Sequence, residues 1–217
     1  LYMIYSMRAN NTLDANRMEA YLQDTYRFTS KGGHTHFTLN YGVRMSHWSF
    51  NKETIVSPRV SLGIIPAYSE NTTFRFAAGL YYQAPFFKEL RDTSTVNGIT
   101  YANLNEKIKS QRSIHFIAGY DYRFRINNLR YRFSAEAYYK ALGNFIPYSV
   151  NNVKVVYYGE NRASGHATGI DLKLYGEFVP GADSWLTFSL MNTSMKLNGK
   201  SVPLPTDQRF AVNLFFT

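Results

Sequence analysis

The feature that most constrains this chain is an alternation of polar and apolar residues that continues over long segments. In GIDLKLYGEF, residues 169–178, polar side chains occupy the odd positions from Asp171 to Glu177, and apolar side chains lie between them. Because successive side chains of a β-strand point to opposite faces, this pattern predicts a strand with one polar and one apolar face. Such a strand suits a half-buried sheet in water, and it also suits a membrane barrel whose apolar face meets lipid.

The alternation recurs along the chain, so that the sequence predicts nine strands. Besides 169–178, the predicted strands are residues 16–29, 34–48, 57–67, 72–83, 111–125, 129–143, 184–197 and 206–217. Several of these segments are much longer than the strands of globular proteins, which usually have about 5–6 residues. This length favours a membrane barrel over a soluble sandwich.

The polar faces carry charges of both signs. A water-filled or plugged barrel interior hydrates and pairs such charges, whereas a dry core would hold them only at a high free-energy cost. We therefore expect the polar faces to line the interior of a barrel. The residues expected to face this lumen are Arg75, His115, Asp121, Arg123, Arg130, Arg132, Glu136, Lys140, Asp171, Lys173 and Glu177.

The links between the predicted strands also favour an outer-membrane barrel. Short links are expected at 30–33, 69–73, 126–129 and 180–184, and longer ones at 49–56, 84–110, 144–164 and 198–206. The two kinds alternate, so the short links fall at one end of the sheet, as short periplasmic turns do in such barrels. The prediction is an all-β, antiparallel up-and-down transmembrane β-barrel with long extracellular loops, of which this chain supplies about nine strands.

Two kinds of short signal add detail to this barrel. Asn97-Gly98 and Asn198-Gly199 predict tight hairpin turns inside the long links, and Asn151-Asn152 predicts a third such turn. Aromatic residues near strand ends suit an interfacial girdle; these are Trp48, Tyr82, Tyr139 and Trp185.

Composition and motifs give no sign of catalysis. The chain has no cysteine, so it offers no thiolate metal site, and it has no phosphate-binding loop or dinucleotide fingerprint. His34 and His36 could share a strand face, but no third metal ligand is apparent. His115 and Asp121 would lie about 20 Å apart along one strand, too far for a triad with Ser113. We expect no enzyme activity, no catalytic residues, no metal and no cofactor.

The net charge of +9 suggests an anionic partner such as lipid headgroups or an acidic ligand, although the positive residues are scattered and we expect no nucleic-acid binding. The long links at 84–110 and around 157–162 combine aromatic rings with amide and guanidinium donors. Such a set suits a small nutrient ligand such as a glycan, a peptide or a siderophore-like compound. The expected ligand-binding residues are Phe86, Phe87, Arg91, Asp92, Tyr101, Asn105, Tyr157, Tyr158, Asn161 and Arg162.

Four stretches resemble the barrel of TonB-dependent outer-membrane receptors. They are SPRVSL (57–62), FRFAAGLYYQAPFFKEL (74–90), AEAYYKALGNFIPY (135–148) and ASGHATGIDLKLYGEF (163–178). The Tyr-Tyr-Lys and Pro-Thr-Asp (205–207) sequences are similar to those of receptors from Bacteroides-type bacteria. The resemblance covers most of residues 16–217.

The resemblance implies an outer-membrane receptor for energised nutrient uptake, with a plug domain inside the barrel and TonB as the periplasmic partner. Because the family barrel has about 22 strands, residues 1–217 are expected to be a segment of one barrel domain, with the plug domain and the final strands outside it. The alternatives are a passive porin-like outer-membrane channel, an outer-membrane enzyme, and a soluble β-sandwich that binds an anionic ligand.

Overall fold

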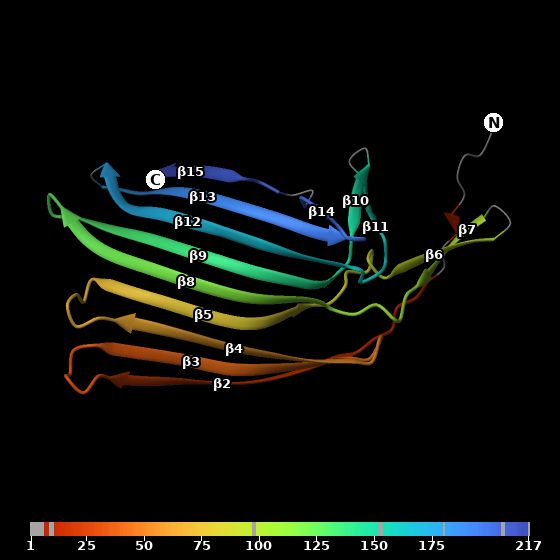
Figure 1. Cartoon of the computed structure of the whole chain (residues 1–217), viewed down its shortest axis with the longest axis horizontal. Helices are drawn as coiled ribbons and strands as arrows, with labels where there is room; N and C mark the ends of the chain where they lie inside the picture. Colours follow the sequence, from red (N-terminus) through yellow and green to blue (C-terminus); the bar gives the residue numbers. More distant parts are fainter. Residues whose placement is uncertain are drawn as a thin grey trace.

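The nine predicted strands are present and form one antiparallel sheet (Figure 1). The computed structural model describes residues 7–8, 11–96, 99–151, 154–179, 181–204 and 207–216. The long strands are β2 (Arg17–Thr29), β3 (His36–Trp48), β4 (Glu53–Ile65), β5 (Thr72–Gln83), β8 (Gln111–Ile126), β9 (Leu129–Phe145), β12 (Ala163–Val179), β13 (Ala182–Leu197) and β15 (Phe210–Phe216). Each pairs with the long strand that follows it in the chain, as in an up-and-down barrel.

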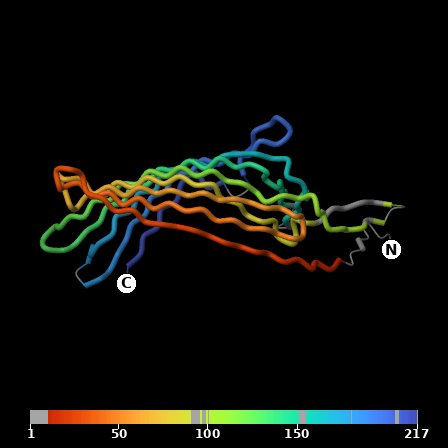
Figure 2. Tube along the Cα trace, turned by 90° about the horizontal axis from the view of Figure 1, so that it is seen from below, coloured from red at the N-terminus to blue at the C-terminus, as the bar shows by residue number. Residues whose placement is uncertain are grey.

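The described sheet is open, as expected for part of a barrel. One edge is β2, and the other is shared by β15 and the short β14 (Lys200–Val202), which both pair with β13. Figure 2 shows that the sheet is curved and that the chain runs steadily across it from β2 to β15. No helix in the described residues is long and apolar enough to cross a membrane.

The short links lie at one end of the sheet, which is at the left of Figure 1. One of the two shortest joins β8 to β9 through Asn127 and Asn128, whose φ angles are 50° and 65°. Two successive residues with positive φ form the type I′ turn that matches the twist of the flanking strands, and asparagine tolerates this conformation well. The predicted short link at 126–129 is therefore confirmed.

The opposite end of the sheet carries small hairpins within the long links, at the right of Figure 1. β6 (Arg91–Val96) pairs with β7 (Ile99–Leu104), and β10 (Tyr148–Asn151) pairs with β11 (Lys154–Tyr157). The turn residues 97–98 and 152–153 lie outside the described residues. β13 turns into β14 through Asn198 and Gly199, both with positive φ, as the Asn-Gly signal predicts.

One predicted long loop is wrong. Residues 49–56 were expected to form a long external link, but β4 already begins at Glu53, so only residues 49–52 join β3 to β4. The reason is that Glu53 to Val56 continue the antiparallel pairing with β3, from Trp48 opposite Glu53 to Met45 opposite Val56. Short and long links therefore do not alternate strictly along the chain.

The cross-strand register keeps most apolar side chains on one face and most polar ones on the other; Asp24 and Ile117 are exceptions. One register row joins Leu62, Phe76, Ala118, Ala137 and Ile170, which are all apolar. The adjacent row on the same strands, one residue away, points to the other face, because side chains alternate. The apolar face thus runs continuously across the sheet, as a lipid-facing surface requires.

Aromatic rings follow one another along the apolar face at the short-turn end. Tyr122 contacts Phe124, Phe124 contacts Tyr131, and Tyr131 contacts Phe178, with ring centroids 5.5–6.3 Å apart. These rings form a row that suits a membrane interface. Two of the residues predicted for a girdle, Trp48 and Trp185, are on the polar face. Trp48 is opposite Arg17 in the register. Trp185 is opposite Tyr175, and Tyr175 is opposite Arg132.

Candidate functional site

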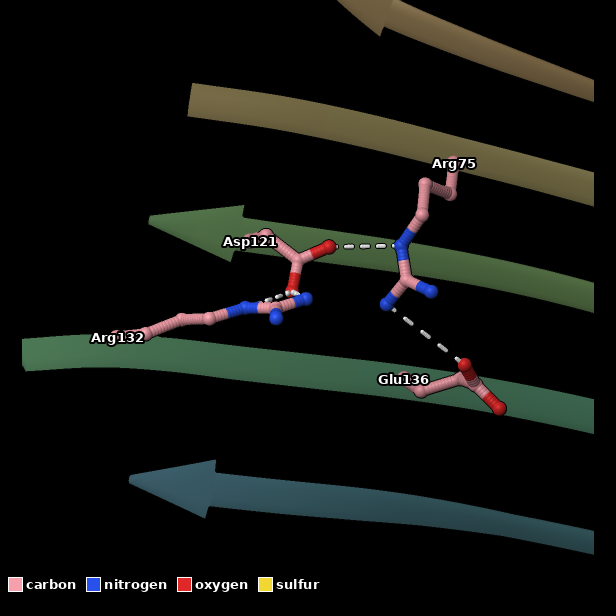
Figure 3. A network of polar contacts seen from close by, with 4 residues as sticks. All are labelled: Arg75, Asp121, Arg132 and Glu136. Atoms are coloured by element: carbon pink, nitrogen blue, oxygen red, sulfur yellow. Dashed lines mark hydrogen bonds and ion pairs between the residues drawn. The ribbon is translucent and has the colours of Figure 1, made fainter. Parts of the chain in front are cut away.

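An ion-pair network crosses the polar face of the sheet near the short-turn end (Figure 3). Asp121 Oδ2 on β8 lies 2.7 Å from Arg75 Nε on β5, and Asp121 Oδ1 lies 2.8 Å from Arg132 Nη2 on β9. Arg75 Nη2 also lies 3.9 Å from Glu136 Oε2 on β9. The Asp121 side chain is only 7% exposed, so its charge depends on these two guanidinium groups for compensation.

A glycine leaves room for this network. Arg75 is opposite Gly119 in the register, and a Cβ at position 119 would lie only 3.2 Å from Arg75 Nη2. The guanidinium therefore lies flat over the Gly119 backbone and reaches Asp121 and Glu136 on strands beyond its own. A side chain at position 119 would require the guanidinium to shift from this position.

The remaining residues predicted for the lumen share the face of Asp121. Arg123 is opposite Arg132, Asp171 is opposite Glu136, and Lys173 is opposite Ser134. Arg130 is opposite Arg125 beside the β8–β9 turn. By strand alternation, these residues and the ion-pair network line one surface, while the contact of that surface with a solute or a plug stays a prediction.

Two predicted lumen residues sit at special places on this face. Glu177 lies beside the β12–β13 turn, and its carboxylate accepts a 3.4 Å hydrogen bond from the backbone N–H of Gly181. His115 stacks on Tyr81, with ring centroids 4.3 Å apart and an interplanar angle of 25°. Tyr81 and its neighbour Arg59 were missed in the sequence, although Ser57, Arg59 and Ser61 alternate with apolar residues and could have pointed to a polar face there.

The external loops form a unit with a core of its own. Leu90 and Ile108 from residues 84–110 pack with Ile146 and with Trp48, and all four side chains are buried. Glu53 Oε2 accepts hydrogen bonds from the backbone N–H and the hydroxyl of Ser110, at 2.9 and 2.6 Å. The loops are therefore fixed to each other and to the end of the sheet.

Two of the predicted ligand residues hold this loop unit together. Asn161 Nδ2 donates to the carbonyl oxygens of Lys109 and Asn144, both at 2.8 Å, while its Oδ1 accepts from Lys109 N–H at 2.7 Å. Asn105 Nδ2 donates to the carbonyl oxygen of Gly159 at 2.8 Å. In this structure the two amides bind the backbone of neighbouring loops, so they are structural groups here.

Other predicted ligand residues are on the surface of the loop unit. Phe86, Phe87, Tyr101 and Tyr158 are exposed, and the Arg162 guanidinium lies over the Tyr158 ring, 5.1 Å from its centroid. Tyr157 is half-buried, with its ring 5.8 Å from that of Tyr148. Arg91 and Asp92 belong to β6, and their side chains lie outside the described part of the structure. Ligand contact by any of these residues stays a prediction.

A buried carboxyl group lies beneath the exposed phenylalanines. Glu89 is 4% exposed, and its Oε2 accepts a 2.8 Å hydrogen bond from Phe86 N–H, while Gln111 Nε2 lies 3.3 Å from its Oε1. Burial raises the pKa of Glu89 above the ordinary carboxyl value, against the opposing effect of the two hydrogen bonds. The loop unit thus holds a carboxyl group that binds its proton more tightly than an exposed carboxyl group does.

Comparison with known proteins identifies the family of this chain. A comparison with curated proteins gave no match. A family described as TonB dependent receptor-like, β-barrel, matches residues 3–217. Proteins of this family are outer-membrane receptors and transporters, not enzymes. The resemblance inferred from the sequence is therefore confirmed, and this chain belongs to the TonB-dependent receptor-like β-barrel family.

Proposed function

We propose that this chain is the barrel segment of a receptor that imports a scarce nutrient across the outer membrane with energy from TonB. The observation that carries the proposal is the two-sided sheet, with the Arg75–Asp121–Arg132 network on one face and a continuous apolar surface on the other. One face suits lipid, and the other suits a hydrated interior that accepts charged groups. Membership of the TonB-dependent receptor family supports the choice of an energised receptor.

The proposed mechanism divides the work between the two ends of the barrel. External loops capture the nutrient, and the exposed rings of Phe86, Phe87, Tyr101 and Tyr158 provide apolar contact surface for it. A plug domain of the same receptor seals the interior and rests against the charged face. TonB displaces the plug from the periplasmic side, and the nutrient then passes along the charged face without any chemical change.

The fixed loop unit supports capture by a preformed surface. Asn161 and Asn105 join the two long links through backbone carbonyl groups, and Leu90 and Ile108 provide an apolar core beneath. A loop surface that is already ordered loses less conformational entropy when it binds a ligand. The aromatic residues are therefore presented in place, before the nutrient arrives.

Solute depletion from the growth medium tests the proposal and does not require the ligand to be identified first. Cells that produce the full-length receptor are compared with receptor-deletion cells, each with and without TonB, and the medium is analysed by untargeted mass spectrometry. The proposal expects at least one solute to be depleted only when receptor and TonB are both present. Depletion that needs the receptor but not TonB would identify a passive channel and contradict energised uptake.

A further inference from the structure

A row of basic side chains crosses the polar face between the ion-pair network and the loops. Arg59 on β4 is opposite Gly79 on β5, Gly79 is opposite His115 on β8, and His115 is opposite Lys140 on β9. Residues that pair across antiparallel strands point to the same face. Arg59, His115 and Lys140 therefore share one face and one level of the sheet, and together with Tyr81 and Tyr138 they are called the basic row below.

Aromatic rings hold these basic groups in place. The Arg59 guanidinium carbon lies 4.4 Å from the centroid of Tyr81, and Tyr81 stacks on His115 at 4.3 Å. Gly79 provides the space, because a Cβ there would lie 2.9 Å from Tyr81 Cε2 and 3.2 Å from Arg59 Cγ. Lys140 Nζ lies 5.1 Å from the centroid of Tyr138. The positive groups are thus oriented by rings and not by carboxylates.

Within the described part of the chain, the two charged ends of the basic row, Arg59 and Lys140, have no carboxylate partner. Arg75 lies four residues closer to the short-turn end than Gly79 does, roughly 13 Å along the strand. Its charge is neutralised by Asp121 and Glu136. The same face therefore has paired charges at one level and free positive charges at the next. Free positive charge on a surface of low dielectric attracts anions.

Space for a solute adjoins the basic row. A hollow of about 800 Å³ lies beside Arg59 and Tyr81. Gln23 and Asn40 also line it, together with Asp24 and with Glu19, whose carboxylate is paired with Arg44. This volume is within the range of small-molecule binding sites, which is roughly 300–1,000 Å³. The two amide side chains add neutral hydrogen-bond donors and acceptors next to the free guanidinium.

We propose that the basic row is an anion-binding subsite on the solute path, and that the imported nutrient carries a carboxylate or phosphate group. The inference rests on the proposed function and names the chemical class of its substrate. Guanidinium and ammonium groups make short, charge-assisted hydrogen bonds to both kinds of oxyanion. The Tyr81 and Tyr138 rings leave flat apolar surfaces for the uncharged part of the solute.

Calorimetric titration of the purified full-length receptor tests the subsite. The probes are citrate for the carboxylate class, inorganic phosphate for the phosphate class, and glycerol as the uncharged comparison. We expect at least one anion to bind and glycerol not to bind. Arg59→Met and Lys140→Met, which keep side-chain length and remove the charge, each weaken anion binding about tenfold, as loss of one charge-assisted hydrogen bond does.

Arg27→Met is the matched control. Arg27 lies on the same face of β2, four residues from Gln23, which is on the register row of Arg59. The substitution removes the same charge two strands from Arg59 and roughly 13 Å along the strands from the level of the basic row, so we expect unchanged anion binding. Each variant is first shown to keep the electrophoretic mobility of the folded barrel.

Two results would contradict the proposed anion-binding subsite. One is binding of both anions weaker than about 10 mM, and the other is an equal loss of binding in Arg27→Met and Arg59→Met, which would mean a diffuse charge effect. The titration needs no TonB, so its outcome is independent of the test of energised uptake. Anion binding without TonB-dependent depletion contradicts energised uptake alone, and TonB-dependent depletion of an uncharged solute contradicts the subsite alone.

Discussion

The carboxylate of Asp121 on β8 lies 2.8 Å from the guanidinium of Arg132 on β9, although the two residues are diagonal to each other in the register. Directly opposite Arg132 is Arg123, so two positive side chains would otherwise meet on adjacent strands. Like charges in directly opposite positions destabilise a strand pair. The diagonal contact places a negative charge next to one of the two arginines and links β8, β9 and, through Arg75, β5.

Asp121→Asn is expected to lower the free energy of unfolding of the full-length receptor by about 1–3 kcal/mol. Removal of one partner of a buried ion pair leaves the other charge uncompensated, and here two arginines lose the same carboxylate. The lower end of the range reflects the partial exposure of both arginines, at 44% and 51%. Urea-induced unfolding in detergent measures the change.

Glu160→Gln provides the matched control for this charge removal. Glu160 pairs with Arg162 at 3.3 Å, but both side chains are exposed, so the effect is expected to stay below about 0.5 kcal/mol. Equal effects of the two substitutions would refute a structural role for the network.

Asn161→Ala is expected to separate the two long external links. The substitution removes three hydrogen bonds to the backbone of Lys109 and Asn144, each worth about 1 kcal/mol. Protease added to intact cells should then cut residues 84–110 at least about tenfold faster. Asn16→Ala, at an exposed asparagine just before β2, is the control and should leave the cutting rate unchanged. An equal rate in Asn161→Ala would show that the amide does not hold the loops.

The loop unit is expected to be more stable in acid than at neutral pH because of Glu89. Burial raises the pKa of this carboxyl group in the folded loop, so the folded loop binds the proton more tightly than the unfolded loop does. The resulting stabilisation is complete below the ordinary carboxyl pKa and is lost as the pH rises through the raised value. Protease cutting within residues 84–110 should therefore accelerate as the pH rises from the ordinary carboxyl pKa, about 4, through the raised pKa of Glu89.

Glu89→Gln tests the origin of this pH dependence. The amide resembles the protonated carboxyl group in size and in lacking a charge, so the variant should show a flat profile once the intrinsic pH dependence of the protease is subtracted. An unchanged profile in Glu89→Gln would assign the effect to another group.

The faces of the sheet could be predicted because alternation is a local property. From Ile114 to Asp121 most residues show their face by their own polarity, Ile117 being an apolar residue on the polar face, and the register of β8 with β5 and β9 agrees with that assignment. The short link at residues 126–129 was predictable for the same reason, since Asn127 and Asn128 favour the turn that the backbone adopts. Local signals sufficed for these features.

Features that depend on distant contacts were not predictable. The amide of Asn161 suits a ligand as well as it suits the backbone of Lys109, and nothing in the sequence reveals that residues 52 positions apart meet. Trp48 looked like a membrane-interface residue, but it packs on Leu90 and Ile108 of a distant loop. The loop predicted at 49–56 was too long because its last residues continue a strand whose partner is β3.

The most direct test of the central claim is site-directed spin labelling along β8, from Ser113 to Tyr122. The chain contains no cysteine, so each introduced cysteine is the only one in this part of the receptor. In lipid vesicles the account predicts an alternating pattern: labels at even positions such as 116 and 118 collide with oxygen dissolved in lipid, and labels at odd positions do not. High accessibility to a water-soluble nickel complex at the even positions would contradict a lipid-facing apolar surface, and with it the barrel.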